Sequence, residues 1–545
     1  MLKNTLIFIL ASFVAACNGK KTKADLIIIH ATIYTVDASF SKATAMAVKD
    51  GKILETNSDE NILAKYDATE TLNLNGKTIV PGFIDAHCHF TGYATDLWKC
   101  NLVGSNSYDD VLSRMKTYAK SAPMLWLYGR GWDQNDWEDK TYPSNKELNE
   151  LFPNRPVFIK RIDGHAAIAN DVALALAGIT ANTKVNGGKV VLLNGKPSGL
   201  LIDQAMTLVD KVVPQIPDTM ALRYFKQTEQ ICLSLGLTGV HDCGVADHTV
   251  DLLRRMDSLQ QLQIKVFAML SDDSVHYTKW LKQGPLKMPH VHVGGFKVYA
   301  DGALGSRGAC LLAPYSDDKQ WHGFLLSDTT HFKNLATRLA QTPFQMCTHA
   351  IGDSANRFML QTYARVLKGK NNKRWRIEHA QVVNDADFHW FGDFNIIPSV
   401  QPTHATSDMY WAAMRLGEKR MAGAYAYKRL LDQNHRIPLG TDFPVEDISP
   451  IKTFYAAVFR KDKNNYPAAG FQTENALSRE EALRGMSIWA AYAAFEENEK
   501  GSLEKNKAAD FLVLDTDILR CAEKDVLQTK VLATYVNGKL VFSNN

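Results

Sequence analysis

Two histidines separated by one residue, His87 and His89, are the first candidates for chemistry in this sequence. In a β-strand, residues i and i+2 project from the same face, so two imidazoles at this spacing can bind one cation together. A second pair with the same spacing, His290 and His292, lies at the start of another predicted strand, after a proline. Because an odd separation puts His292 and Lys297 on opposite faces of a regular strand, we interpret this second pair as structural.

Further residues of ligand type lie at the ends of later predicted strands, at Lys297, His349, His379 and Asp442. Each alone has an ordinary explanation, since a buried imidazole is often held by hydrogen bonds and an aspartate can cap the segment that follows it. In a parallel barrel, however, the strand ends converge on one mouth. The sequence therefore predicts that these four side chains and the first histidine pair surround a common metal site.

The elements that must position these residues are eight strand-like runs that alternate with helical patterns, which is typical of an α/β fold with a parallel sheet. Their predicted ends are His89, Asp242, Leu270, Asp301, His349, His379, Gln401 and Asp442. This pattern predicts a (β/α)8 TIM-like barrel over residues 81–500. The long interval between the first two ends predicts a large insertion at about 91–235, on the face that carries active sites.

Both ends of the chain are β-rich. Asp50-Gly51 and Asn75-Gly76 near the N-terminus, and Asn537-Gly538 near the C-terminus, are strong hairpin signals between short apolar runs. We therefore expect residues 25–80 and 501–545 to build one composite β-sandwich domain beside the barrel.

The first residues are typical of an export signal. Met1 to Ala16 contain a lysine, a short apolar stretch and then small residues, which predicts a signal peptide at 1–16. Val14-Ala-Ala-Cys17 resembles a bacterial lipobox, so Cys17 is the expected lipidation site and 17–24 a tether. This predicts an exported protein, periplasmic or at the cell surface, that contacts the membrane through its lipid anchor only. The alternative is an ordinary signal cut before an unmodified cysteine.

Composition excludes several classes of protein. The 545 residues carry a formal net charge of +4 with no long block of one sign, which argues against a nucleic-acid partner. Seven cysteines remain after Cys17, with no C-x-x-C spacing, so a zinc ribbon or redox motif is not expected. A homodimer remains open.

Several runs resemble a known family. Pro81-Gly-Phe-Ile-Asp85-Ala-His87-Cys-His89 is similar to the opening motif of the metal-dependent amidohydrolase superfamily. Resemblance to amidohydrolase family 3, the subgroup that contains N-substituted formamide deformylase, extends over about residues 25 to 545. It is carried by Gly129-Arg-Gly-Trp132-Asp133-Gln134, Asp163-Gly-His165, Gly295-Phe-Lys297-Val-Tyr-Ala-Asp301, Thr348-His349-Ala-Ile-Gly352-Asp353 and Gly440-Thr-Asp442-Phe-Pro444. The sequence departs from the subgroup at Asp203, where Glu is expected, and at Asn506, where Gly is usual.

The resemblance implies a ligand set and a cofactor. It assigns one or two divalent ions, with zinc as the expected metal, to His87, His89, Lys297, His349, His379 and Asp442. It also implies that Lys297 is N-carboxylated and bridges two ions, because a carbamate supplies the anionic oxygens that such cations favour. The alternative is an unmodified lysine that binds substrate in a site with one ion.

The implied activity is hydrolysis of a non-peptide C–N bond, of amide, N-acyl or N-formyl type, by metal-activated hydroxide with Asp442 as general base. Candidate substrate-binding residues are His165, Trp132, Arg307 and His404, each of which also has a structural interpretation. Clustered tryptophans and tyrosines favour a small, apolar or aromatic substrate, although core packing is the commoner role of such residues. A non-catalytic ligand-binding lipoprotein on the same scaffold and a deaminase are the alternative functions.

Overall fold

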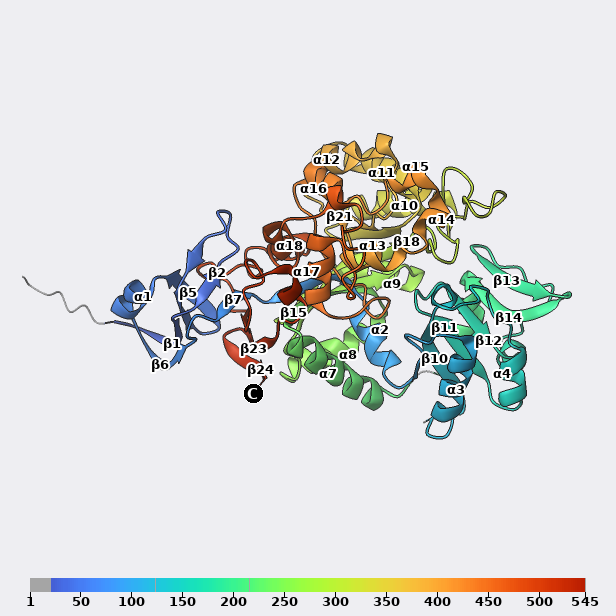
Figure 1. The fold of residues 1–545 in the computed structure, drawn as a ribbon, viewed down its shortest axis with the longest axis horizontal. Helices are drawn as coiled ribbons and strands as arrows, with labels where there is room; N and C mark the ends of the chain where they lie inside the picture. The colour runs from blue at the N-terminus through green and yellow to red at the C-terminus, as the bar shows by residue number, and fades with distance from the viewer. Residues whose placement is uncertain (1–20, 123, 215, 545) are drawn as a thin grey trace, which may run out of the picture.

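The computed structural model describes residues 21–122, 124–214 and 216–544 (Figure 1). The predicted signal segment at 1–16 and Cys17 lie outside the described residues. Within these ranges, no helix has the length and apolar character needed to cross a membrane. The seven cysteines they contain are all free thiols.

Seven parallel strands form the central sheet, and neighbours in the sheet follow one another along the chain. They are β8 (Phe83–Cys88), β15 (Leu237–Val245), β16 (Lys265–Ser271), β18 (Val291–Tyr299), β19 (Gln345–Ala350), β20 (Arg376–His379) and β21 (Ile397–Ser399). The sheet is nearly closed, and the segment around Leu439 lies between its two edges. Leu439 forms a parallel bridge with Val400, and the N–H of Ala86 donates to its carbonyl over 3.0 Å.

The eighth predicted strand, which ends at Asp442, is therefore present as one bridge and not as a full strand. Two features shorten it. Pro438 has no N–H to donate to a neighbouring strand, and Asp442 adopts a left-handed φ of 64°, which turns the chain away from the sheet. The barrel architecture is confirmed, and only the extent of its last strand differs from the prediction.

Helices cover the outside of the barrel because each presents an apolar stripe to it. In α10 (Thr329–Ala340), the buried residues Phe332, Leu335, Ala336 and Leu339 follow helical spacing, and the Asp328 side chain caps the first turn by accepting from the Thr330 N–H. The barrel strands do not need to alternate apolar and polar residues, since the protein interior covers both of their faces. All six residues of β19 are buried.

The expectation that His292 and Lys297 face opposite sides of their strand was wrong. A register shift between β16 and β18 adds one residue, Gly294, to β18, which reverses the alternation beyond it. His292 and Lys297 therefore face the same side, and the His292 ring contacts that of Phe267, with centroids 5.0 Å apart. His292 is still remote from the strand end, and its Nδ1 donates to Glu496 Oε1 over 3.1 Å.

Two further sheets lie beside the barrel, and one of them combines strands from both ends of the chain, as predicted for a composite β-sandwich. One sheet has the order β5-β4-β1-β6, and the other has the order β24-β23-β22-β7-β2-β3. The strands are β1 (Thr22–Ile29), β2 (Thr32–Tyr34), β3 (Lys42–Ala43), β4 (Ala45–Lys49), β5 (Lys52–Asn57), β6 (Tyr66–Asn73), β7 (Thr78–Pro81), β22 (Phe511–Leu514), β23 (Val531–Val536) and β24 (Lys539–Ser543). Residues from both chain ends, such as Ile28, Ile79 and Phe511, share one buried cluster between the sheets.

Two of the three predicted hairpins are confirmed. Asp50-Gly51 joins β4 to β5, and Asn537-Gly538 joins β23 to β24. Asn75-Gly76 forms a turn, but the strands it joins belong to different sheets. The reason is that β6 pairs in parallel with β1, whereas β7 pairs with β22 and β2.

The insertion after β8 contains its own six-stranded sheet, seen at the right of Figure 1. Its strands are β9 (Cys100–Asn101), β10 (Leu127–Trp132), β11 (Val157–Arg161), β12 (Ala166–Ala169), β13 (Gly188–Leu193) and β14 (Lys196–Asp203). Helices α3 (Tyr108–Tyr118), α4 (Lys146–Leu151) and α5 (Asp171–Leu176) complete this unit. The loop between β11 and β12 carries His165, which brings the insertion to the mouth of the barrel.

Candidate metal centre

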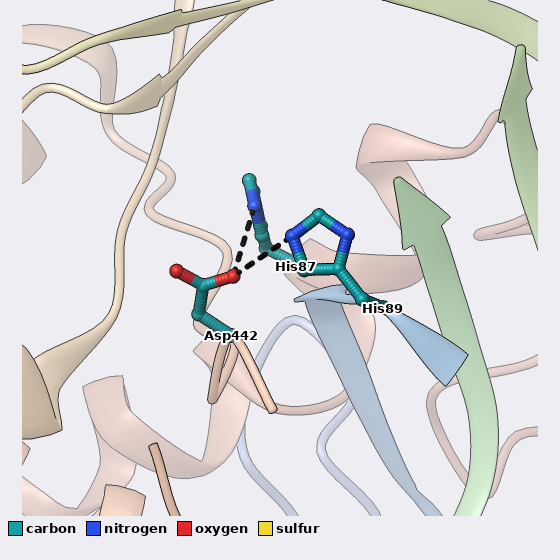
Figure 2. Close-up of side chains that lie close together, drawn as sticks. All are labelled: His87, His89 and Asp442. Carbon is teal, nitrogen blue, oxygen red and sulfur yellow. Dashed lines mark ion pairs between the residues drawn. The ribbon is translucent and has the colours of Figure 1, made fainter. Parts of the chain in front are cut away.

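One carboxylate oxygen of Asp442 faces both histidines of the first pair (Figure 2). Asp442 Oδ1 lies 3.2 Å from His89 Nε2 and 3.5 Å from His87 Nε2. His87 belongs to β8, His89 follows it directly, and Asp442 follows the closing segment of the barrel. Residues more than 350 positions apart in the sequence thus meet where the first and last strand positions of the barrel adjoin.

Three imidazoles are oriented by a hydrogen bond from their Nδ1 atom. The bonds run from His87 to Glu378 Oε2 (2.5 Å), from His379 to Gln401 Oε1 (2.7 Å) and from His89 to the Cys243 carbonyl (3.0 Å). Each bond leaves Nε2 without its proton and directed to the centre, which is the usual preparation of a histidine for metal binding.

Two residues of the centre have unusual backbone conformations. His379 has a φ of 71° and Asp442 a φ of 64°, both in the left-handed region that non-glycine residues rarely adopt. In the sheet, His349 on β19 pairs with Glu378 on β20, and paired residues face the same side. In a regular strand, therefore, Glu378 would point into the barrel and its neighbour His379 would point outward. The left-handed turn at His379 brings this second side chain to the same site, and the surrounding structure must hold such a conformation in place.

The electrostatics keep three of the imidazoles, those of His87, His349 and His379, neutral. Burial, together with the charge of Lys297, lowers the pKa of His87 to about 4. Burial also lowers the pKa of His349 and His379 well below the usual value. Neutral imidazoles are the form that binds a metal ion.

Asp442 is held ionised. Burial opposes its charge, but His87 and the hydrogen bond from His404 keep the pKa of Asp442 well below its usual range. His404 Nε2 lies 3.1 Å from Asp442 Oδ2, and its Nδ1 lies 3.4 Å from Glu446 Oε1. Although burial lowers it, these two carboxylates raise the pKa of His404 well above the ordinary value, so His404 is protonated beside Asp442.

The donor set fits a divalent cation. Asp442 Oδ1 is buried and has no hydrogen-bond partner among the described residues. Two ligand atoms that each lie 2.0–2.1 Å from one tetrahedral zinc ion are about 3.3 Å apart. The distances from Asp442 Oδ1 to the two imidazole nitrogens, 3.2 Å and 3.5 Å, are close to this value. In the described part of the chain, two groups have ligand atoms close enough to hold an ion, namely His87, His89 and Asp442, and His379, His404 and Asp442.

Lys297 and His349 lie beside these groups. Lys297 is fully buried, and its Nζ lies 2.9 Å from His87 Nε2 and 5.0 Å from the centroid of the Tyr299 ring. The His349 ring is centred 4.6 Å from that of His379. Its Nε2 faces the Gly302 carbonyl at 3.5 Å and Asp301 Oδ1 at 3.6 Å.

Of the predicted substrate-binding residues, His165 and His404 lie at the centre. The His165 ring is centred 5.4 Å from that of His349, and its Nδ1 donates to Asp203 Oδ1 over 2.6 Å. Asp203, the residue that departs from the subgroup pattern, therefore orients His165. The other departure, Asn506, has a φ of 70°, which explains why glycine is usual there.

Trp132 and Arg307 have other partners. Trp132 is fully buried in the core of the insertion, where its indole N–H donates to the Ile159 carbonyl over 3.1 Å. This position corrects its assignment as a substrate contact, because a residue inside a packed core is not accessible to a ligand. The Arg307 guanidinium pairs with Asp317 over 3.0 Å, and Asp317 also pairs with Arg415, so the substrate-binding role of Arg307 stays a prediction.

Sequence reasoning did not assign roles to the residues that orient the imidazoles. Glu378 precedes His379 directly, and its carboxylate reaches His87 across the barrel. Gln401 was identified as a strand end, without its contact to His379. The signal that was available is that polar residues at the ends of buried strands must find partners, since burial without a hydrogen bond is costly.

The family follows from this fold and site together with the sequence. Residues 70–542 match the model of the Amidohydrolase family. The chain belongs to the amidohydrolase family, and its parallel α/β barrel carries His and Asp groups able to bind metal.

Particular relatives extend over nearly the whole chain. Protein LONG AFTER FAR-RED 3 of Arabidopsis thaliana is 33% identical over 538 residues, which cover 95% of this chain and 92% of that protein. N-substituted formamide deformylase of Arthrobacter pascens is 29% identical and covers 95% of this chain and 98% of its own length. The solved structure of an uncharacterized metal-dependent hydrolase from Pyrococcus horikoshii matches with a TM-score of 0.75 at 26% identity, covering 92% of this chain and 99% of that one.

Proposed function

We propose that this protein is a zinc-dependent hydrolase of a non-peptide C–N bond, of amide, N-acyl or N-formyl type, with Asp442 as general base. The observation that carries the proposal is the position of Asp442. Its Oδ1 is buried and unpartnered between two imidazoles, while its Oδ2 accepts a hydrogen bond from His404. One oxygen is available to a cation, and the other is held by a protonated neighbour. The similarity to N-substituted formamide deformylase supports the class of bond.

The roles of the side chains follow from their protonation states. When bound, a divalent cation polarises a carbonyl and makes a water molecule a stronger acid. Asp442 is ionised and can accept a proton from water, then return it to the leaving amine. His404, which donates to Oδ2, orients the carboxylate and stabilises its charge. Burial lowers the pKa of His165, but the hydrogen bond to Asp203 and the nearby carboxylates outweigh it and raise this pKa. In its protonated form, His165 donates from Nδ1 to Asp203 and supplies its Nε2–H to the oxygen on which negative charge develops during attack.

We further propose that Lys297 is N-carboxylated and completes a place for a second ion with His349 and His379. As an unmodified ammonium, its Nζ would put a positive charge 2.9 Å from the nitrogen with which His87 would bind a cation. A carbamate reverses the sign of this charge.

We propose a small apolar or aromatic substrate, as the aromatic content of the sequence suggests, and an exported protein with a lipid anchor at Cys17. Both proposals rest on sequence alone, on the aromatic residues and on the signal pattern of Met1 to Ala16.

The test of the hydrolytic assignment is Asp442→Asn in the zinc-loaded protein, with N-benzylformamide as substrate. Asparagine keeps one oxygen but cannot take a proton, so we expect the variant to retain much of its zinc and to lose about 10²- to 10⁴-fold in kcat. Formate release and zinc content by mass spectrometry are measured together. Asp393→Asn, at an exposed carboxylate with 61% of its side-chain surface accessible, is the control. A metal-loaded Asp442→Asn protein with normal turnover would exclude Asp442 as the base.

A further inference from the structure

Tyr299 is the last residue of β18 and follows Lys297 by two positions. Residues at this spacing project from the same side of a strand, so both side chains face the interior of the barrel. The Nζ atom of Lys297 lies 5.0 Å from the centroid of the Tyr299 ring. Tyr299 therefore lies one step closer to the mouth of the barrel, and it is partly exposed where Lys297 is fully buried.

The ring of Tyr299 adjoins His349, which lies beside the metal-binding groups. Its centroid is 5.4 Å from that of the His349 ring, on the neighbouring strand β19. The ring of His165, which the insertion contributes, lies at the same distance from His349. Two side chains that can donate a hydrogen bond, one from the barrel and one from the insertion, thus adjoin the same imidazole.

The Tyr299 hydroxyl is free and accessible. It has no hydrogen-bond partner among the described residues, and it is not one of the enclosed side-chain atoms that lack a partner. A ligand at the mouth of the barrel can therefore reach it.

Gly244 shows where this hydroxyl lies. A Cβ at Gly244 would be 3.5 Å from the Tyr299 oxygen, so the hydroxyl lies over the end of β15, two strands away from its own. The residue before Gly244 is Cys243, whose carbonyl accepts the hydrogen bond that orients His89. The Tyr299 side chain thus extends from the His349 side of the centre to the segment that holds His89.

Other tyrosines packed in the barrel bond their hydroxyl internally. Tyr277 donates to Asp272 over 2.7 Å. Tyr315 donates to the Ala309 carbonyl over 2.8 Å. Tyr299 makes no such bond, so its hydroxyl adds nothing to the hydrogen bonding of the fold and is available to a substrate.

We propose that Tyr299 is a catalytic residue that donates a hydrogen bond to the oxygen of the scissile carbonyl, as a second donor beside His165. This inference rests on the proposed hydrolysis. A phenol is protonated at neutral pH and can donate. When hydroxide adds to the carbonyl carbon, negative charge forms on the oxygen and the hydrogen bond from Tyr299 becomes stronger. The phenol keeps its proton, and the bond weakens again when the C–N bond breaks and the carbonyl forms again.

The test is Tyr299→Phe in the zinc-loaded, full-length protein, with N-benzylformamide as substrate. Phenylalanine keeps the ring beside Lys297 and His349 and removes only the hydroxyl. We expect kcat to fall about 10- to 100-fold, because the lost bond stabilises charge that is present only during attack. KM and zinc content should stay unchanged.

A binding measurement makes the test independent of turnover. N-Benzyl methylphosphonamidate has a tetrahedral phosphorus with charged oxygens in place of the planar carbonyl. By calorimetry, it should bind to Tyr299→Phe about 10- to 100-fold more weakly than to the unsubstituted protein.

Tyr277→Phe is the matched control. Tyr277 is a buried tyrosine of helix α9 (Ser274–Gln283) whose hydroxyl has a partner, so this variant should have a lower melting temperature and an unchanged kcat. Tyr299→Phe should show the opposite, because no hydrogen bond of the fold is lost.

The proposal is overturned if Tyr299→Phe keeps its kcat or its affinity for the phosphonamidate, if it loses zinc, or if the unsubstituted protein binds no phosphonamidate. Failure of the proposed hydrolysis would look different. In that case, the unsubstituted protein would bind the phosphonamidate more tightly than Tyr299→Phe does, yet release no formate from N-benzylformamide, and the role of Tyr299 as a donor to a tetrahedral anion would stand.

Discussion

At the scale of single residues, the chemistry of the centre depends on the state of Lys297. Both Lys297 and His87 are completely buried, and their nitrogens are 2.9 Å apart. A permanent ammonium at this distance would compete with any cation for the same imidazole. The carbamate proposed for Lys297 removes this conflict and makes metal binding depend on carbon dioxide.

We therefore expect the metal-free protein to take up two zinc ions per chain in buffer with bicarbonate and one ion in buffer free of carbon dioxide. Lys297→Met should bind one ion in both buffers, whereas Lys297→Glu, which carries its own carboxylate, should bind two ions in both. Zinc is counted by mass spectrometry after desalting.

Lys287→Met, at an exposed lysine, is the control and should behave as the unsubstituted protein. If bicarbonate does not change the zinc content of the unsubstituted protein, Lys297 is not carboxylated.

The centre was predictable from sequence only in part. The meeting of His87, His89 and Asp442 was predictable because ligand-type residues at strand ends converge in a barrel, whereas their metal-binding role stays a prediction. The contacts of Glu378 and Gln401 were not predictable, because their partners lie on other strands and only the closed barrel brings them together. Trp132 was misplaced because an indole in a packed core and one in a binding site give the same sequence signal.

At the scale of elements, one extra residue in β18 determines which side chains enter the barrel. Beyond the bulge at Gly294, side chains that a regular strand would point outward point into the barrel, so counting residues along the strand predicts the wrong face. Glycine is needed there for lack of space, since a Cβ would lie 2.6 Å from Cε2 of Phe267 and 3.1 Å from Nε2 of His292. Lys297 follows this bulge by three residues, so its position depends on it.

Gly294→Ala should lower stability by about 1–3 kcal/mol, because the Phe267 ring or the strand must move to accept the methyl group. We also expect a lower zinc content, since a displaced strand moves Lys297. Thermal unfolding and zinc content are measured on the same samples.

Gly239→Ala is the matched control, as this glycine also lies in a barrel strand but its added Cβ would have no neighbour closer than 3.4 Å. Equal stability of the two alanine variants would show that the bulge tolerates a side chain.

Local sequence patterns predict some parts of the fold, but they do not reveal contacts between distant segments. Strand positions and the composite sandwich follow from local patterns of apolar and turn residues. The bulge at Gly294, the single bridge at Leu439 and the parallel pairing of β6 with β1 depend on contacts between distant segments. At Asn75-Gly76, the predicted turn is present, but the two strands that it joins do not pair with each other as a hairpin requires.

At the scale of the whole molecule, a buried ion pair joins the barrel to the sandwich. Lys265, the first residue of β16, lies 2.5 Å from Asp510, which precedes β22, and its Nζ also donates to Asn537 Oδ1 over 2.9 Å. The side chains of Lys265 and Asp510 are 10% and 4% exposed. The C-terminal part of the sandwich is thus connected to the barrel at the N-terminal end of β16, opposite the metal centre.

Asp510→Ala should destabilise the protein by about 3–5 kcal/mol, because it leaves the ammonium of Lys265 buried without its partner. The double variant Lys265→Met/Asp510→Leu should recover much of this loss, since no charge then remains in the interface. Glu499→Ala breaks the Lys287–Glu499 pair, whose side chains are 43% and 57% exposed, and it should cost less than about 1 kcal/mol. Thermal and urea unfolding of the four proteins decide between these expectations. An Asp510→Ala protein as stable as Glu499→Ala would mean that water reaches Lys265, and that the barrel and sandwich are held together by their apolar contacts alone.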